Sequence, residues 1–129
     1  MTNGTWVNPQ ISSASYSDSY RGDPISNGQF IGWNAKSQYG WITLNFTEPQ
    51  TFDSVKISAY GQPASSETYT LYKDGGIKIG QSTQMVSEAG SAFVIPVTSG
   101  TYSSLTIYVS VGVGQSWAEI QQVLLGFNN

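Results

Sequence analysis

The side chains best suited to chemistry in this sequence are aromatic rings and amides that gather in predicted loops. Trp33 and Trp41 flank a polar segment in which Asn34, Lys36 and Tyr39 offer an amide, a cation and a phenol. A sugar presents an apolar C–H face that stacks on an aromatic ring, and its hydroxyls hydrogen-bond amides and charged groups. Because a binding site needs a few polar groups converging beside an apolar surface, this segment predicts a binding role.

Trp117 is a second candidate for contact with a ligand. It follows a glycine-rich stretch, residues 112–116, which we expect at a tip of the molecule. Exposing an indole to water is costly. Two interpretations therefore stand: the ring is a platform on which a sugar stacks, or it folds back over its own loop.

Two more predicted loops carry side chains of the same kind. Tyr20 and Arg21 belong to a loop rich in tyrosine and serine, a composition typical of adaptable binding surfaces. The Arg21 guanidinium can donate two parallel hydrogen bonds to vicinal hydroxyls or to a carboxylate. Tyr60 and Gln62, on another loop, are expected to complete a shallow pocket.

Catalysis is not indicated. The chain has no cysteine and no histidine, so it lacks the commonest nucleophile–base pairs and the commonest general base. Its eight acidic residues are scattered, and no pair is placed for glycoside hydrolysis, which needs two carboxyl groups across one bond. We therefore expect a protein that is not an enzyme.

Length and charge set further bounds. The 129 residues fit one domain, residues 1–129, with 1–10 as a lead-in segment. A net charge of -3 without a basic cluster argues against nucleic acid. No apolar run reaches membrane-spanning length, and no signal peptide opens the chain. The low charge and the many Ser, Thr, Gly and aromatic residues are typical of extracellular or virion-surface β-domains.

The pattern that must position these loops is alternation of apolar and polar residues. It predicts strands over residues 41–46, 52–60, 68–72, 77–79, 92–97, 105–111 and 118–127. Turns are expected at Asn27-Gly28, at 48–50, at Asp74-Gly75 and at 99–100, and a polar connection over 81–90. We expect Trp33 and Trp41 in the core or beneath a loop. Short strands at regular spacing predict an all-β sandwich or barrel.

The order of landmarks resembles a known family. The landmarks are Asn27-Gly28, Trp33, the strands at 41–46 and 52–57, the hairpin at 69–75 and Ala118-Glu119. Over residues 11–127 they resemble the discoidin domain, also called the coagulation factor 5/8 C-type domain, and within it the family 32 carbohydrate-binding modules. The resemblance implies an eight-stranded antiparallel jelly-roll β-sandwich. It also implies ligand binding at loops on one end, with an aromatic residue, here Trp117, in the last loop.

The resemblance further implies a structural calcium ion near the Asn27 turn. The positions that match its ligands are Pro24, Asn27, Gln29, Gly32, Ala118 and Glu119. Asn27 stands where aspartate is usual, and only Glu119 brings a formal charge. Because calcium affinity follows the number of charged ligands, two interpretations stay open. The site binds calcium weakly, or the turn is held by hydrogen bonds without a cation.

Together these features predict a non-catalytic carbohydrate-binding module or lectin, extracellular or at a virion or cell surface. It would bind a terminal, galactose-like sugar of a glycan or glycoconjugate. The alternative is an attachment or protein-interaction module of a virion, an adhesin or a larger secreted protein. Phospholipid binding needs apolar loops flanked by basic residues, and no loop of this chain has that pattern.

Overall fold

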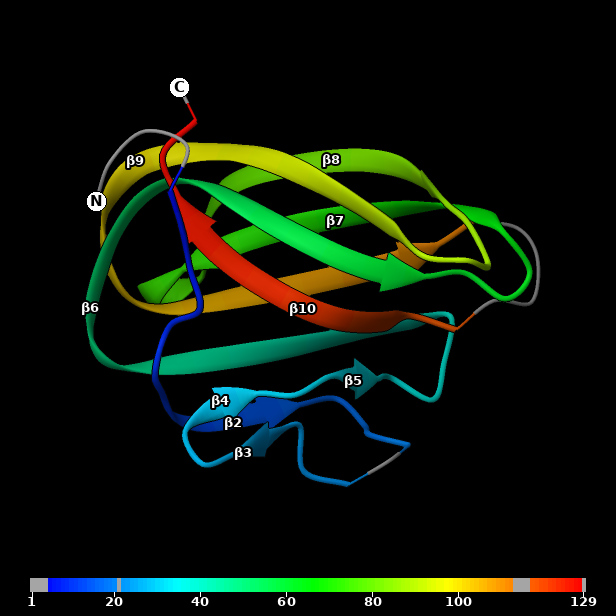
Figure 1. The fold of residues 1–129 in the computed structure, drawn as a ribbon, viewed down its shortest axis with the longest axis horizontal. Coiled ribbons are helices and arrows are strands. Elements are labelled where there is room, and N and C mark those ends of the chain that lie inside the picture. The colour runs from blue at the N-terminus through cyan, green and yellow to red at the C-terminus, as the bar shows by residue number, and fades with distance from the viewer. Residues whose placement is uncertain (1–4, 21, 113–116, 129) are drawn as a thin grey trace.

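The structure, a computed structural model, describes residues 5–20, 22–112 and 117–128. In this part of the chain nearly all regular structure is antiparallel β, as the alternation predicted. The strands are β1 (Trp6–Val7), β2 (Ile11–Tyr16), β3 (Ile25–Ser26), β4 (Gln29–Phe30), β5 (Trp33–Asn34), β6 (Tyr39–Tyr60), β7 (Ser65–Lys73), β8 (Ile77–Val86), β9 (Ser91–Val111) and β10 (Glu119–Gly126), with one 3₁₀ turn, η1 (Asp74–Gly76) (Figure 1). No helix long and apolar enough to span a membrane occurs among the described residues.

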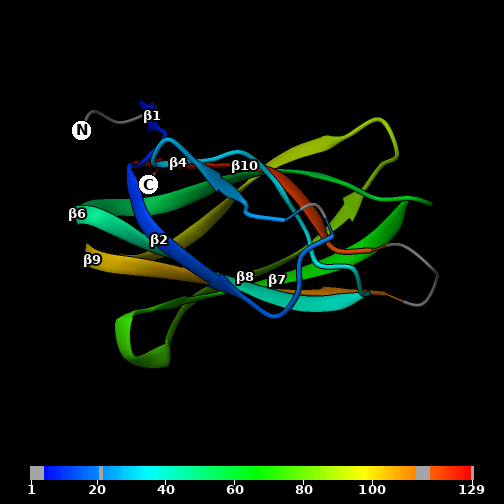
Figure 2. The same ribbon diagram turned by 90° about the horizontal axis from the view of Figure 1, so that it is seen from below.

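Two long strands, β6 and β9, bend and so belong to both layers of the sandwich. Figure 1 shows both curving round the left-hand side of the molecule, and Figure 2 gives the same ribbon from below. Layer A contains β2, residues 39–46 of β6, residues 101–111 of β9, and then β7 and β8. Layer B contains β10 between β1 or β5 and residues 50–60 of β6, followed by residues 91–100 of β9.

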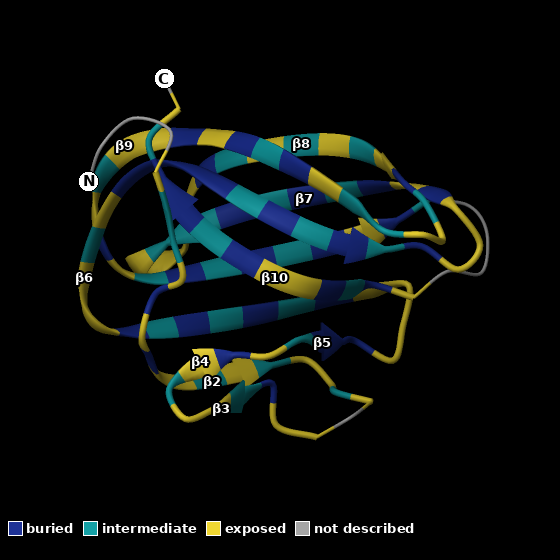
Figure 3. Cartoon of the chain, in the orientation of Figure 1, coloured by how far each residue is buried: buried dark blue, intermediate teal, exposed yellow. Residues whose placement is uncertain are grey.

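The core lies between the layers and follows the alternation directly. Ile42 and Leu44 of β6 and Leu105 and Ile107 of β9 are fully buried, while the residues between them face outward. Figure 3 shows the buried and less buried bands succeeding one another along the strands. Strands of period two bury every second residue, so the predicted all-β sandwich is confirmed.

Three segments differ from the sequence-based expectation. Residues 81–86, predicted as a connection, continue β8, because their backbone pairs with β7 as far as Ser65 and Val86. The turn predicted at 48–50 is an irregularity inside β6, where the register with β9 shifts between Asn45 and Gln50. The turn at 99–100 likewise lies within β9. In all three segments the strand continues because its backbone pairs with residues distant in the sequence. Local sequence does not specify such pairing.

Several connections gather at one end of the sandwich, which we call the loop end. They are residues 35–38, 61–64 and 87–90, on the right in Figure 1. Gly112, which follows β9, and Trp117, which precedes β10, lie at the same end. Ladder pairs fix this arrangement, because Tyr39 at the start of β6 lies opposite Ser110, and Tyr60 at its end lies opposite Glu119. The β7–β8 hairpin with its η1 turn lies at the other end.

Candidate functional site

The loop end carries exposed aromatic side chains. Trp117 is 54% exposed and Tyr20 is 67% exposed. Rings of this size are normally covered in a folded domain, and exposed ones often mark contact surfaces. The Trp117 ring is thus accessible to a ligand, while the loop that precedes it, residues 113–116, lies outside the described residues.

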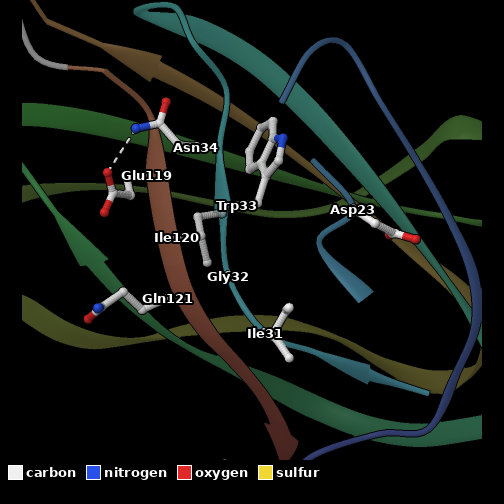
Figure 4. Close-up of a pocket in the computed structure, with 8 residues that line it drawn as sticks. All are labelled: Asp23, Ile31, Gly32, Trp33, Asn34, Glu119, Ile120 and Gln121. Carbon is white, nitrogen blue, oxygen red and sulfur yellow. Dashed lines mark hydrogen bonds between the residues drawn. The ribbon is translucent and has the colours of Figure 1, made fainter. Parts of the chain in front are cut away.

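Asn34 organises the predicted binding loop instead of facing a ligand. Its side chain is 6% exposed; its Nδ2 donates to Glu119 Oε1 at 2.9 Å, and its Oδ1 accepts from the Lys36 backbone N–H at 2.8 Å (Figure 4). The second bond closes a tight turn in which Lys36 takes a positive φ of 62°. Lys36 is exposed as a result.

Backbone hydrogen bonds hold the 34–38 loop to the strands around it. Ala35 N–H donates to the Ala118 carbonyl at 2.8 Å, and Ala118 N–H donates to the Ser37 carbonyl at 3.0 Å. Val111 N–H donates to the Gln38 carbonyl at 2.8 Å. These bonds connect the loop that presents Lys36 with Ala118, the residue next to Trp117. The side chains of Lys36 and Trp117 therefore lie at the same end of the molecule.

The other predicted binding residues occupy different positions. Tyr20 joins the site through its backbone, whose N–H donates to the Asn34 carbonyl at 2.9 Å. Tyr60 is half-buried at the end of β6, and Gln62 is exposed in the next connection. The Tyr39 ring lies 6.3 Å from that of Tyr108, on the outer face of layer A.

Arg21, the last of the predicted ligand contacts, lies outside the described residues. Its neighbour Gly22 is exposed and has a positive φ of 89°.

A cavity of about 240 Å³ lies beside Asn34 and holds two acidic side chains. Asp23 and Glu119 line it together with Gly32, Trp33 and Asn34 (Figure 4). Both carboxylates already accept hydrogen bonds: Asp23 from the Ile25 N–H at 3.0 Å and Glu119 from Asn34. This small, polar hollow is separate from the exposed Trp117 ring.

Of the six predicted calcium ligands, Gly32 and Glu119 line the cavity beside Asn34. Asn27 and Gly28, with φ of 52° and 75°, form the tight turn between β3 and β4, and Gly28 is bonded to Ile11. Asn27 therefore lies at the tip of this hairpin, and Gln29 opens its second strand.

Three of the predicted oxygen ligands accept hydrogen bonds in the structure. The Pro24 carbonyl accepts from Ile31 N–H at 2.8 Å, the Ala118 carbonyl accepts from Ala35, and Glu119 accepts from Asn34. The described residues contain no group of three or more acidic, histidine or cysteine side chains able to hold a metal. Calcium binding at these positions stays a prediction, and no step below depends on the ion.

We expect calcium to change the stability of the protein little, because only Glu119 among the predicted ligands brings a formal charge. A structural ion present at one hundred times its Kd adds about 2.7 kcal/mol, which would raise Tm by several degrees. Melting curves recorded in millimolar calcium and in chelator should therefore agree within about 1 °C. A calcium-dependent rise of several degrees would show that the predicted ligands rearrange to bind the ion.

Trp33 and Trp41, expected to pack alike, differ in the structure. Trp33 is buried, and its Nε1–H donates to the Asp18 carbonyl at 2.8 Å, as a packed indole should. Trp41 is only half-buried and lies on the outer face of layer A, where it lines a groove with Tyr72 and Tyr108. The expectation of packing in the core or beneath a loop was wrong for Trp41, because no element in the described part of the chain covers that face.

No protein-family model and no curated protein matches this sequence. Solved structures do match, among them the family 32 carbohydrate-binding module of AlyQ in complex with 4,5-unsaturated mannuronic acid. It is 17% identical, with a TM-score of 0.66 over 92% of this chain and 97% of that one. Truncated AlyQ, which also contains alginate lyase domains, matches over 33% of its length.

Two further structures match to a similar degree. A pectin-binding carbohydrate-binding module is 18% identical, with a TM-score of 0.64 over 91% of each chain. A family 32 module from Clostridium perfringens, in complex with GalNAc-β-1,3-galactose, is 15% identical, with a TM-score of 0.60 over 88% of this chain and 94% of that one. The chain thus has the discoidin-like β-sandwich fold of the family 32 carbohydrate-binding modules.

Proposed function

We propose that this protein is a non-catalytic carbohydrate-binding module that binds a terminal sugar at the loop end. The observation that carries the proposal is the exposed Trp117 indole, next to a residue that is hydrogen-bonded to the 34–38 loop. An indole covers the apolar face of a pyranose at little cost in entropy, because the ring has few rotatable bonds. The carbohydrate-binding modules that share the fold support this ligand class.

The polar part of the site would come from the residues around the ring. The Lys36 ammonium and the Tyr20 hydroxyl are exposed at the same end and can hydrogen-bond sugar hydroxyls. A shallow site of this kind binds each sugar weakly, and repeated copies of the module or of the sugar raise the overall affinity. We propose a galactose-like terminal residue, with the module working outside the cell or on a cell or virion surface.

Binding should depend on the ring of Trp117 in particular. We expect Trp117→Ala to lower the affinity for terminal sugars at least tenfold, a loss of about 1.4 kcal/mol, and Trp117→Phe to retain most of it. Ile77→Ala is the matched control, because Ile77 is 56% exposed but lies at the opposite end. All three substitutions are on the surface, so Tm should change little.

The measurement is a glycan array followed by calorimetry, with terminal galactosides, N-acetylgalactosaminides and uronic-acid oligosaccharides as probes. A preference for the first two classes supports the galactose-like specificity, and a preference for uronic acids replaces it with an acidic sugar. Unchanged binding by Trp117→Ala, or no binding to any terminal sugar, would refute the loop-end site.

A further inference from the structure

The outer face of layer A carries a groove that the loop-end site does not use. Its volume is about 470 Å³, within the range of small-ligand sites. β6 contributes Trp41 and Thr43, β9 contributes Thr106 and Tyr108, β7 contributes Tyr72, and β2 contributes Ser15. Because each of these residues faces away from the core, the groove is a property of the sheet surface.

The aromatic rings form one connected surface across three strands. The Tyr108 ring lies 6.4 Å from Trp41, at 34° between planes, and 5.3 Å from Tyr72, at 73°. Tyr39 extends the surface toward the loop end. From β6 to β7 the surface spans two strand spacings, about 10 Å, which is longer than a single pyranose ring. Its size suits a segment of an oligosaccharide.

Ordered hydroxyl and amide groups lie beside these rings. The Thr43 and Thr106 hydroxyls are 2.7 Å apart, and Gln81 Nε2 donates to Thr70 Oγ1 at 2.8 Å. Donors and acceptors that are fixed before binding lose little entropy when a ligand arrives. Cross-strand pairs of this kind also stabilise a sheet, so binding has to be tested separately from stability.

The side chains that line the groove are uncharged throughout the described residues. Three charged side chains lie near the groove along the strands, and each has a partner. Lys73 lies over the Tyr102 ring at 5.7 Å, Lys78 donates to Gln81 at 3.1 Å, and Asp74 accepts from Ser103 N–H and the Ser104 hydroxyl at 3.0 and 2.7 Å. A neutral surface of rings and hydroxyls offers no counter-charge to nucleic acid or to an acidic lipid. It is complementary to a neutral polyhydroxylated chain.

We propose that this face is a second carbohydrate-binding site, which binds an internal segment of a neutral polysaccharide by stacking on Trp41, Tyr108 and Tyr72. The ligand class is the one given in the proposed function, but the residues are different. The two sites therefore make separate predictions: the loop end needs a chain terminus, and the face of layer A does not.

Binding is measured by affinity electrophoresis and calorimetry with the neutral polysaccharides hydroxyethylcellulose, glucomannan and arabinoxylan. Polygalacturonate serves as a charged comparison. Ser15→Arg fills the groove from an exposed position on β2 without removing a core contact. Trp41→Ala removes the platform. Gln122→Arg adds the same charge to an exposed position on layer B and is the matched control.

We expect Ser15→Arg and Trp41→Ala each to weaken binding of at least one neutral polysaccharide tenfold or more, while Gln122→Arg and Trp117→Ala keep most of it. Melting curves of Ser15→Arg and Gln122→Arg should agree, which separates blocked binding from misfolding. Wild-type affinity in Ser15→Arg, loss of all polysaccharide binding in Trp117→Ala, or no binding of these polymers overturns the second site. The loop-end site is decided independently by the terminal sugars, so either site can fail alone.

Discussion

Replacing Trp33 with alanine should lower the free energy of unfolding by about 4 kcal/mol. The indole is 3% exposed and belongs to the hydrophobic core, so the substitution leaves a large cavity. It also deletes the hydrogen bond from Nε1 to the Asp18 carbonyl. The loss of this hydrogen bond adds about 1 kcal/mol to the cost of the cavity.

Trp41→Ala is the matched comparison for Trp33→Ala. Trp41 has the same side chain and is separated from Trp33 by one short loop, but its ring is half-buried and borders solvent. We expect its loss to cost less than half as much, because water fills the space that the ring leaves. Chemical denaturation of the two variants measures both values, and equal losses would show that the outer face of layer A is packed as tightly as the core.

The sequence predicted which residues of β6 face away from the core, but not which elements pack against them. Alternation places Trp41 on the same side as Thr43 and opposite Ile42, and the structure agrees. Whether that side is covered depends on another element packing against it, which is a tertiary property. The groove on layer A was therefore missed, although Trp41, Tyr72 and Tyr108 were correctly assigned to strands. Ser15, which also lines it, lies in β2, and no strand was predicted there.

The predicted calcium site shows the same difference between local structure and tertiary packing. The Asn27-Gly28 turn is encoded locally, because both residues tolerate the positive φ of a tight hairpin. Where the hairpin points is decided by its contacts with β2, through the bond from Ile11 N–H to the Gly28 carbonyl. Matching positions along the chain gave a ligand list, and binding of the ion at those positions stays a prediction.

A buried carboxyl group could have been found from the sequence. Glu67 alternates in phase with Tyr69 and Leu71, and all three side chains are fully buried in the structure. The alternation of β7 thus places an acidic residue on the apolar side of the strand. Such a residue is buried only where it is hydrogen-bonded or uncharged. The burial of Glu67 should therefore make the free energy of unfolding depend on pH.

Raising the pH from 5 to 8 should lower the free energy of unfolding by about 2 kcal/mol because of Glu67. Burial raises its pKa from 4.5 to about 7, and the hydrogen bond from the Tyr69 hydroxyl, 2.5 Å from Oε1, opposes part of that shift. Burial and the neighbouring carboxyl raise the pKa of Tyr69 above its ordinary range, so Tyr69 stays a donor. Glu67 Oε2 has no partner among the described residues.

The sign of the effect follows from proton binding. Between pH 4.5 and 7 the folded protein keeps the Glu67 proton while the unfolded chain releases it, so stability falls as the pH rises. The contribution is complete below pH 4.5 and is lost as the pH passes through about 7. Above that pH the folded state must contain a buried, ionised carboxylate with one hydrogen bond, which is unfavourable.

Glu67→Gln tests the assignment, because glutamine keeps the shape of the side chain and an acceptor for Tyr69 but does not titrate. Urea unfolding at several pH values between 5 and 8 should show the loss of stability in the wild type and a nearly flat profile in the variant. Since Glu67 lies opposite Val111 in the ladder, next to the connection that leads to Trp117, a flat wild-type profile would mean that solvent reaches the carboxyl group from the loop end. A decline of equal size in Glu67→Gln would instead assign the pH dependence to another group.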